Sequence, residues 1–334
     1  MQRILIVKTS SLGDIIHCLP VVNDIHQHFP NVQIDWILED SFADIPHMHA
    51  GVNQAVSVAM RRWKKHIFSQ STWAEINDLK KLIKQNQYDA IIDCQGLLKS
   101  AFITKQANGT KYGYDKQSIR EPIASWFYDK TYAISHQQHA VTRNRALCAM
   151  SLGYAIPTNA PEYGIESHGI SIENNASASR IAIGLDIGGL QDDYLIALHG
   201  TSRVSKLWPV ANWVALGREL AKKNLNVALP WASEAEFYRA KEIAKQLQNA
   251  IVLPKLSIAQ IASVIANAQA AIGVDTGLSH LAAALNVSTI AIYTDTNPAL
   301  TGVMAGAIKP AVNEGGIAQT PSVVDVLNAL KPLI

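Results

Sequence analysis

Short apolar runs alternate with amphipathic stretches along the first half of the chain. Four apolar runs recur about every 25 residues, and each has the length of a buried strand. They occupy residues 4–7, 34–38, 55–59 and 90–93. Helical spacing occurs between them, as in residues 73–84, where the apolar side chains fall on one face. This alternation predicts an α/β fold in which helices cover both faces of a parallel sheet.

The alternation restarts in the second half of the chain. The strands expected there are residues 195–199, 227–229, 251–253, 271–274 and 289–293. The helices expected there are residues 210–223, 233–248, 258–267 and 277–285. The two halves share no sequence repeat, yet both predict a doubly wound parallel sheet, so we expect two Rossmann-like domains.

Turn-forming residues interrupt the pattern between residues 156 and 193, where Pro, Asn, Ser and Gly are dense. We therefore expect a first domain at 1–165, an irregular linker at 166–193 and a second domain at 194–320. The final segment, 321–334, holds a helical stretch that can pack on either domain. Two sheets joined by one linker are expected to face a central cleft. Dehydrogenases, some ligases and glycosyltransferases share that layout, so the fold alone does not define the function.

The first expected strand leads directly into a loop of small and polar residues, 8–14. Lys8, three hydroxyl side chains and Gly13 bring the chain to one carboxylate, Asp14, at the start of an amphipathic stretch. Ligands bind at the carboxyl ends of the strands in open α/β sheets. The sequence therefore places Asp14 at a candidate active-site edge, although an aspartate at this position can also serve only to cap a helix.

Charge is distributed unevenly over the 334 residues, whose net charge is +2. Residues 51–150 hold 15 Lys/Arg against 7 Asp/Glu, a balance of +8, and the remainder hold 14 against 20, a balance of −6. Part of the excess is a basic run that follows an expected strand and so lies at the sheet edge of Asp14. That run contains Arg61, Arg62 and Lys64, and Arg120 can join it. The pattern indicates an anionic partner, unless the run is only a solvated face.

The clearest motif of the second half is residues 273–280, Gly-Val-Asp-Thr-Gly-Leu-Ser-His. A strand that ends near Asp275 and a helix that opens at Thr276 and Gly277 leave free backbone N–H groups, which suit a phosphate. His280 lies one turn into that helix, where it can donate a hydrogen bond to the same anion. The alternative is that Asp275 or Thr276 only caps the helix.

A second candidate loop, residues 199–209, follows the first strand of the second half. Thr201 and Ser202 supply hydroxyl donors, and Lys206 supplies a point charge. This combination suits a diphosphate. The alternative is that the loop is solvated surface.

Several other functions lack their sequence signals. Neither loop reads GxGxxG or GxxxxGK[ST], which argues against a dinucleotide-dependent oxidoreductase and a P-loop enzyme. The His, Cys and acidic residues show no metal-ligand spacing, so we expect no metal and no other cofactor. We expect no signal peptide, because the N-terminal apolar run has only four residues and ends at Lys8, and no apolar stretch approaches the roughly 18 residues of a membrane span. We therefore expect a soluble or peripheral protein.

In combination, the motifs resemble the ADP-heptose:lipopolysaccharide heptosyltransferases. The resemblance rests on four segments in the same order: residues 8–14, 93–97 (Asp-Cys-Gln-Gly-Leu), 201–209 and 275–280. The runs at 61–64 and 229–231 are most similar to the branch that adds the first heptose to the Kdo region. The match covers nearly the whole chain outside the linker and the C-terminal stretch. Loop 294–298 departs from it, reading Thr-Asp-Thr-Asn-Pro where the family more often has Gly-Pro-Thr-Asp-Pro.

The resemblance implies a GT-B-type fold, with the acceptor on the first domain and the nucleotide-sugar on the second. It assigns Asp14 as the catalytic base. Acceptor-binding residues are then Ser11, Gly13, Arg61, Arg62, Lys64 and Arg120. Donor-binding residues are Thr201, Ser202, Lys206, Glu236, Leu256, Asp275, Thr276, Gly277 and His280. Among these, Glu236 matches a residue that binds ribose hydroxyls, and Leu256 stands where a Met often lines the adenine pocket.

The activity implied by the resemblance is inverting, metal-independent transfer of L-glycero-D-manno-heptose from ADP-heptose. Its acceptor is the Kdo region of Kdo-lipid A, in lipopolysaccharide inner-core synthesis. We expect a monomer in the cytoplasm, peripheral to the inner membrane, with no nucleic-acid partner. The alternatives are a core heptosyltransferase that acts later and a non-catalytic module that binds a nucleotide or another anion.

Overall fold

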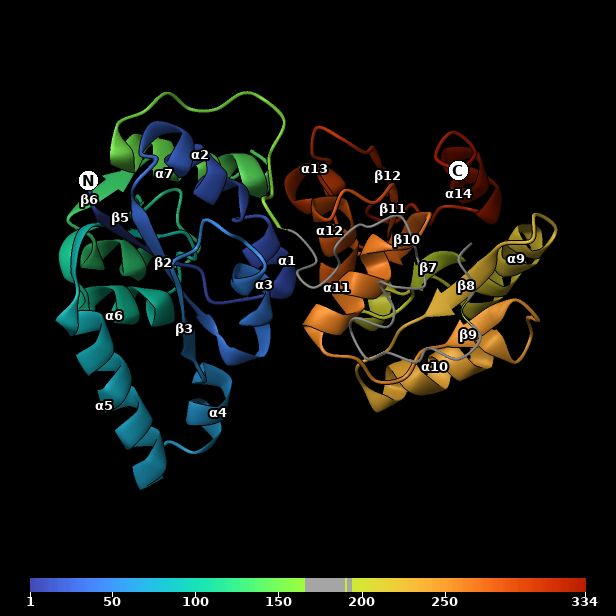
Figure 1. Cartoon of the computed structure of the whole chain (residues 1–334), viewed down its shortest axis with the longest axis horizontal. Helices are drawn as coiled ribbons and strands as arrows, with labels where there is room; N and C mark the ends of the chain where they lie inside the picture. The colour runs from blue at the N-terminus through green and yellow to red at the C-terminus, as the bar shows by residue number, and fades with distance from the viewer. Residues whose placement is uncertain (166–189, 191–193) are drawn as a thin grey trace. The chain divides into compact units, whose positions relative to one another are not determined.

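The computed structural model describes residues 1–165, Leu190 and residues 194–334. The chain forms two compact units, residues 1–165 and 166–334. Apart from Leu190, the expected linker at 166–193 lies outside the described residues. Each unit contains its own six-stranded parallel sheet (Figure 1).

In the first unit the strands follow the order β3-β2-β1-β4-β5-β6. They are β1 (Arg3–Val7), β2 (Gln33–Glu39), β3 (Gln54–Val58), β4 (Gln87–Asp93), β5 (Asn108–Tyr114) and β6 (Lys130–Tyr132). Central strands are apolar throughout because helices cover both faces, and the side chains of residues 4–7 are fully buried. Val7 pairs with Ile37 on one side and with Asp93 on the other, so all three strands end at one edge.

Helices connect these strands and cover the sheet. They are α1 (Leu12–Ile16), α2 (Pro20–His28), α3 (Asp44–His47), α4 (Met60–Lys65), α5 (Gln70–Gln85), α6 (Leu98–Gln106) and α7 (Ala140–Leu152). Two 3₁₀ turns, η1 (Asp40–Phe42) and η2 (Pro122–Phe127), complete the unit. Helices α5 and α6 pack on one face through Ile83 and Ile103, and α2 packs against α7 on the other (Figure 1).

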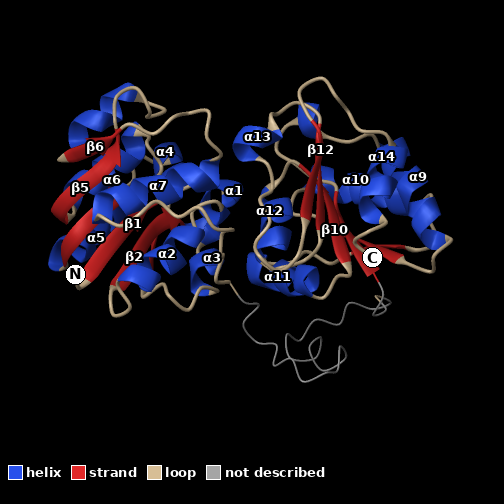
Figure 2. Cartoon of the chain, turned by 90° about the horizontal axis from the view of Figure 1, so that it is seen from above, coloured by secondary structure: helices blue, strands red, loops and turns tan. Residues whose placement is uncertain are grey.

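The second sheet has the order β12-β11-β10-β7-β8-β9. Its strands are β7 (Tyr194–Leu198), β8 (Asn226–Leu229), β9 (Ala250–Val252), β10 (Ala270–Val274), β11 (Thr289–Tyr293) and β12 (Ala311–Gly315). The elements between them are η3 (Val204–Lys206), α9 (Val210–Ala221), α10 (Glu234–Ala244), α11 (Ile258–Ala266), α12 (Gly277–Ala284), α13 (Pro298–Thr301) and α14 (Val323–Leu330). Figure 2 shows α11 and α12 on one side of this sheet and α9 and α14 on the other.

The two units have one topology. Numbered from its own first strand, each sheet has the order 3-2-1-4-5-6, which defines the doubly wound Rossmann arrangement. The prediction of two Rossmann-like parallel sheets is therefore confirmed. The sequence left the packing of the C-terminal helix open, and the structure places α14 on the second unit, where Val326 and Leu330 join the core of Trp208 and Trp213.

Candidate active site

The first sheet reverses its winding between β1 and β4. The chain leaves β1 toward β2 on one side, and it leaves β4 toward β5 on the other side. The loops after β1 and β4 therefore border the crevice in which doubly wound proteins bind ligands. These are the loops at 8–14 and 93–97, two of the motifs found in the sequence.

Asp93 shapes the loop after β4. Its Oδ1 accepts hydrogen bonds from the backbone N–H groups of Gln95 at 2.8 Å and Gly96 at 3.0 Å, and its Oδ2 accepts one from the Tyr128 hydroxyl at 2.8 Å. Burial raises the pKa of Asp93 to about 6, although these hydrogen bonds oppose the shift. Gly96 has a φ of +67°, a left-handed backbone conformation that residues with a Cβ atom rarely adopt. The buried carboxyl thus serves to hold the turn.

Gln95 joins that turn to the loop after β1. Its Oε1 accepts hydrogen bonds from the backbone N–H groups of Thr9 at 2.9 Å and Ser10 at 3.0 Å. A second link comes from the buried Lys8, whose Nζ donates to the Cys94 carbonyl at 2.8 Å. The loop that carries Asp14 is therefore held by side-chain contacts across the crevice.

Asp14 lies in the first turn of α1 and is half-buried. Ser11 donates to its Oδ2 twice, from the backbone N–H at 2.6 Å and from the hydroxyl at 3.0 Å. The aspartate therefore does cap its own helix, as one of the two interpretations of the sequence expected. Within the described residues no contact is recorded for Oδ1, so one carboxylate oxygen is left to accept a ligand proton.

The second sheet reverses its winding between β7 and β10. By the same argument, the loops after these two strands border a ligand crevice. They are the loops at 199–209 and 275–280, the two phosphate-type motifs of the sequence.

Asp275 connects the loops of the second crevice. Its Oδ2 forms an ion pair with Lys206 Nζ at 2.7 Å and accepts a hydrogen bond from the Thr296 hydroxyl at 2.6 Å. The backbone carbonyl of Asp275 accepts a hydrogen bond from the Thr201 hydroxyl at 2.8 Å. The side chains of Lys206 and Asp275 are only 17% and 11% exposed, so the pair is largely shielded from water. This network fixes the position of the Lys206 ammonium.

The N-terminus of α12 faces the same loop. Thr276 is the N-cap residue but its side chain forms no capping hydrogen bond, and Asp275 is engaged by Lys206 instead. Neither side chain therefore caps the helix, and among the described residues no hydrogen bond is recorded for the backbone N–H groups of Gly277 and Leu278, which can bind an anion. His280 is buried one turn further along α12.

The remaining expected donor residues lie around this crevice. Glu236 Oε2 accepts hydrogen bonds from the backbone N–H groups of Ala232 at 2.8 Å and Ser233 at 3.0 Å, at the start of α10. Its carboxyl also lies against Gly200, where an added Cβ would come within 2.7 Å of Oε1. Ser202 is exposed, and Leu256 is half-buried between β9 and α11.

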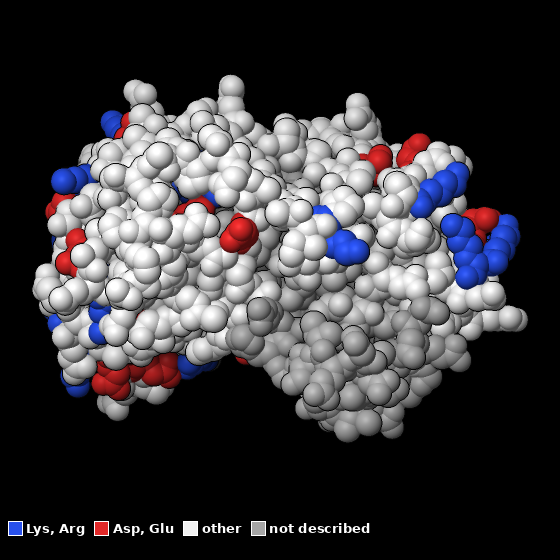
Figure 3. Space-filling view, turned by 45° about the horizontal axis from the view of Figure 1, so that its top comes forward, with Lys and Arg blue, Asp and Glu red and all other residues white. Residues whose placement is uncertain are grey.

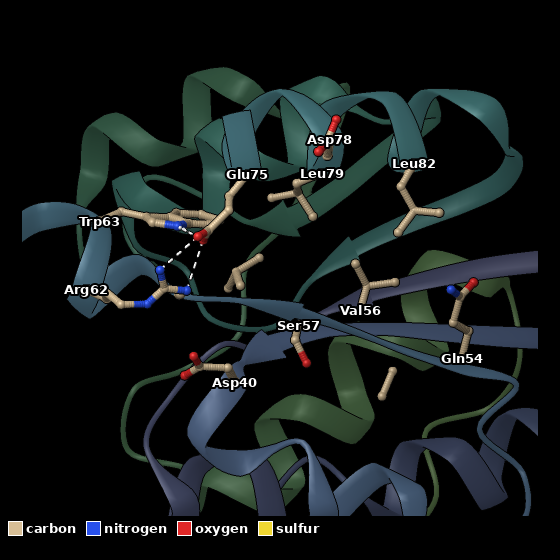
Figure 4. A pocket seen from close by; sticks show the side chains of 13 residues that line it. Asp40, Gln54, Val56, Ser57, Arg62, Trp63, Glu75, Asp78, Leu79 and Leu82 are labelled. Carbon is tan, nitrogen blue, oxygen red and sulfur yellow. Dashed lines mark hydrogen bonds and ion pairs between the residues drawn. The ribbon is translucent and has the colours of Figure 1, made fainter. Parts of the chain in front are cut away.

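The expected acceptor cations differ in their surroundings. Arg62 is bound by Glu75 through two contacts of 2.8 and 2.9 Å, and Trp63 Nε1 donates to the same carboxylate at 2.7 Å (Figure 4). This pairing lowers the pKa of Glu75 and raises that of Arg62. In Figure 4 the side chains of Arg62, Trp63 and Glu75 line a hollow beside β3, and Asp40 and Asp78 line the same hollow. Arg62 is thus already occupied by a carboxylate.

Arg61, Lys64 and Arg120 are exposed. Arg61 lies over the ring of Phe42, with 5.4 Å between the guanidinium carbon and the ring centre. On the face shown in Figure 3, charged side chains form small groups of both signs without a continuous positive patch.

Three contributors to the two crevices were not assigned from the sequence. Gln95 lies in the motif at 93–97, which predicts no role for it, and Lys99 lies outside the predicted motifs, although its Nζ donates to the Ser10 hydroxyl at 3.3 Å. Thr296 belongs to the atypical loop 294–298 and contacts Asp275. The departure of that loop from the family pattern was the available signal.

In the described part of the chain no three His, Cys, Asp or Glu side chains gather as metal ligands would. No helix within it is both long and apolar enough to cross a membrane.

His199 ends up fully buried beside the second crevice. Neither ring nitrogen has a hydrogen-bond partner among the described residues. Burial lowers the pKa of His199 to about 4, and the nearby charge of Arg239 adds to the shift. The ring is therefore neutral in the folded protein at neutral pH.

Similarity to known proteins agrees with this geometry. A family model described as glycosyltransferase family 9 (heptosyltransferase) matches residues 76–324. Lipopolysaccharide heptosyltransferase 1 of Pseudomonas aeruginosa is 44% identical over 302 residues, which cover 90% of this chain and 81% of the relative. The protein of the same name from Escherichia coli K12 is 42% identical, covering 90% of each chain.

Solved structures give the same result. The structure of E. coli heptosyltransferase WaaC with ADP has a TM-score of 0.86 and 38% identity, and the match covers 100% of both chains. The structure of WaaC with ADP-2-deoxy-2-fluoro heptose has a TM-score of 0.85 and 37% identity over the same coverage.

Two parallel sheets, with phosphate-type loops at the switch point of the second, define an enzyme of the GT-B glycosyltransferase class. Within that class, the chain belongs to glycosyltransferase family 9, the heptosyltransferases. The family expected from the motifs is confirmed.

The lowered pKa of His199 predicts a pH-dependent stability. The unfolded chain binds a proton at this ring near pH 6.5, and the folded chain does so only near pH 4, so the free energy of unfolding falls as pH drops through that window. Urea titrations at pH 7.5 and 5 should give a decrease about 2 kcal/mol larger for the wild type than for His199→Gln. Equal decreases for the two proteins would contradict the buried neutral ring.

Proposed function

We propose that this chain moves L-glycero-D-manno-heptose from ADP-heptose to the Kdo region of Kdo-lipid A in lipopolysaccharide core synthesis. The transfer inverts the anomeric centre and needs no metal ion. One observation carries the proposal: each unit holds, at its switch point, the groups that one half of this reaction requires. Relatives named lipopolysaccharide heptosyltransferase 1, and WaaC structures with ADP and an ADP-heptose analogue, support it.

On the acceptor side, Asp14 is the general base. Its Oδ1 takes the proton of the attacking sugar hydroxyl while Ser11 keeps Oδ2 fixed from two donors. The oxygen then bonds to the anomeric carbon as the bond to the ADP phosphate breaks, a single displacement that inverts the centre. Gly13 and Ser11 border the place of the acceptor.

On the donor side, the diphosphate gains negative charge as it leaves. The Lys206 ammonium has three N–H donors, and one of them goes to Asp275, so others can reach the phosphates. The hydroxyl of Ser202, the N-terminus of α12 and His280 complete this anion site. A preformed set of donors stabilises the leaving group without the reorganisation that water would need.

The rest of the nucleotide-sugar contacts the edge of the same crevice. The two recorded hydrogen bonds to the Glu236 carboxyl go to Oε2, so Oε1 can accept from ribose hydroxyls. Leu256 provides an apolar contact for the adenine. Because Lys206 and Thr296 both contact Asp275 Oδ2, its Oδ1 can accept from a heptose hydroxyl.

The acidic acceptor requires cations on the first unit. Lys64, Arg61 and Arg120 are exposed and serve this role, and Arg62 does so on exchanging Glu75 for the acceptor carboxylate or phosphate. In this proposal the chain works as a monomer at the cytoplasmic face of the inner membrane, where the lipid anchor of the acceptor stays in the bilayer.

The role of Asp14 gives the first test. Asp14→Ala should lower kcat by about 10²-fold or more, the usual contribution of a general base, with little change in the KM for ADP-heptose. Release of ADP in the presence of heptose-less lipopolysaccharide measures the rate. Glu219→Ala is the matched control, because that carboxylate lies on α9 and pairs with Lys222 at 2.6 Å on the surface of the second unit. Near-normal turnover by Asp14→Ala would refute the assignment.

Gln95 is a positioning residue for Asp14, and its loss should separate kcat from KM. Gln95→Leu removes the acceptor shared by the Thr9 and Ser10 N–H groups, so kcat should fall about 10- to 100-fold through displacement of the loop. The KM for ADP-heptose should stay near the wild-type value, because the donor binds the other unit. Gln95→Glu keeps an acceptor oxygen and should recover most of the rate. No recovery, or an equal rise in KM, would show a general folding defect instead.

Metal independence and acceptor choice are tested in one assay. Heptose transfer to heptose-less lipopolysaccharide should persist in excess EDTA, because Lys206 and the α12 N-terminus replace a cation at the diphosphate. An acceptor that already carries one heptose should be used poorly. Loss of transfer that Mg²⁺ restores would overturn the metal-free mechanism. Preference for the heptose-bearing acceptor would favour a later-acting core enzyme, and donor binding without transfer would favour a non-catalytic module.

A further inference from the structure

The connection between α4 and α5 presents large apolar side chains to solvent. Phe68 is 100% exposed, Ile67 is 51% exposed and Trp73, in the first turns of α5, is 49% exposed. We call these three residues the α4–α5 tip. Figure 1 shows this connection projecting beyond the sheet of the first unit. A fully exposed phenylalanine beside two half-exposed apolar residues is typical of a contact surface.

The exposure of the α4–α5 tip belongs to a hydrogen-bonded turn. Ser69 N–H donates to the His66 carbonyl at 3.0 Å, and the indole Nε1 of Trp73 donates to the Ile67 carbonyl at 2.8 Å. The turn therefore holds Phe68 outward instead of letting it fold onto the unit. A tryptophan with its N–H satisfied and its ring half-exposed suits an interface between water and lipid.

Cations lie directly beside the tip. Lys64 and Lys65, in the last turn of α4, are exposed, and no ion pair is recorded for either within the described part of the chain. Arg62 differs, because Glu75 neutralises it. Apolar side chains flanked by unpaired lysines are complementary to a bilayer that carries anionic head groups. A polar protein surface would not match the exposed apolar side chains, and a neutral bilayer would not match the exposed lysines.

We propose that the α4–α5 tip docks on an anionic lipid bilayer, with Ile67, Phe68 and Trp73 in the interfacial layer and Lys64 and Lys65 at the head groups. This inference rests on the proposed function, since a glycolipid acceptor places the reaction at such a surface. Insertion of a few side chains together with two lysines gives the reversible binding that an enzyme needs to visit many acceptor molecules.

Vesicle flotation of the full chain tests this inference. Vesicles of phosphatidylglycerol and phosphatidylcholine should retain the wild type, whereas phosphatidylcholine alone should retain much less. Phe68→Ser should weaken binding to the anionic vesicles by about tenfold or more, the value of removing one buried aromatic side chain. Lys65→Gln should weaken it about fivefold. Ile308→Ser, which changes an exposed apolar residue of the second unit, is the matched control and should bind as the wild type does.

A second measurement separates this inference from the proposed function. Phe68→Ser should transfer heptose to a deacylated acceptor in solution at the wild-type rate, yet act more slowly on acceptor embedded in anionic vesicles. Unchanged vesicle binding by Phe68→Ser, or an equal loss in Ile308→Ser, would overturn the docking surface while leaving the activity intact. Loss of vesicle binding by Trp126→Ser, at an exposed residue of η2, with normal binding by Phe68→Ser would also overturn the docking surface. Failure of the wild type to act on either acceptor would instead overturn the proposed function.

Discussion

Parallel pairing at the two switch points is the constraint on which both candidate sites depend. In each unit the first and fourth strands are neighbours, β1 with β4 and β7 with β10, and the chain winds away from them in opposite directions. Their loops are left side by side with no crossover helix between them. Four segments far apart in the sequence therefore meet in two pairs, and all four carry the residues with the most specific chemistry.

The two crevices share this topology but differ in how their loops are joined. In the first, the links are hydrogen bonds: the neutral amide of Gln95 accepts from two backbone N–H groups, and Lys8 donates to the Cys94 carbonyl. In the second, the link is an ion pair between Lys206 and Asp275 that is largely shielded from water. Among the described residues no ion pair is recorded for Asp14, whereas the Lys206–Asp275 pair fixes the position of an ammonium. The same topology thus presents a carboxylate at the switch point of one unit and an ammonium at that of the other.

Most of the fold, and the position of the candidate loops directly after strands, could be predicted from the sequence because strand periodicity and loop composition are local properties. The expected strand 289–293 coincides with β11, and the helical stretch expected within 321–334 forms α14. Three strands, β5, β6 and β12, were not predicted. Gly109, Gly113 and polar side chains hide β5, β6 has only three residues, and β12 has only two apolar residues. The partner of Asp275 at Thr296 could not be predicted, because it depends on how a loop after β11 folds back.

The basic run at residues 61–65 shows why a charge count alone does not define a binding surface. The sequence gives these cations equal weight, but α5 returns past α4 and brings Glu75 onto Arg62 and Trp63. That contact neutralises Arg62 and fixes the start of α5. Trp73, in the first turns of α5, then donates a hydrogen bond to the carbonyl of Ile67. The same packing that pairs Arg62 with Glu75 therefore builds the turn that exposes Phe68 beside Lys64 and Lys65. The paired cation, Arg62, orders the packing of α4 against α5, whereas Lys64 and Lys65 keep the surface beside the α4–α5 tip positive.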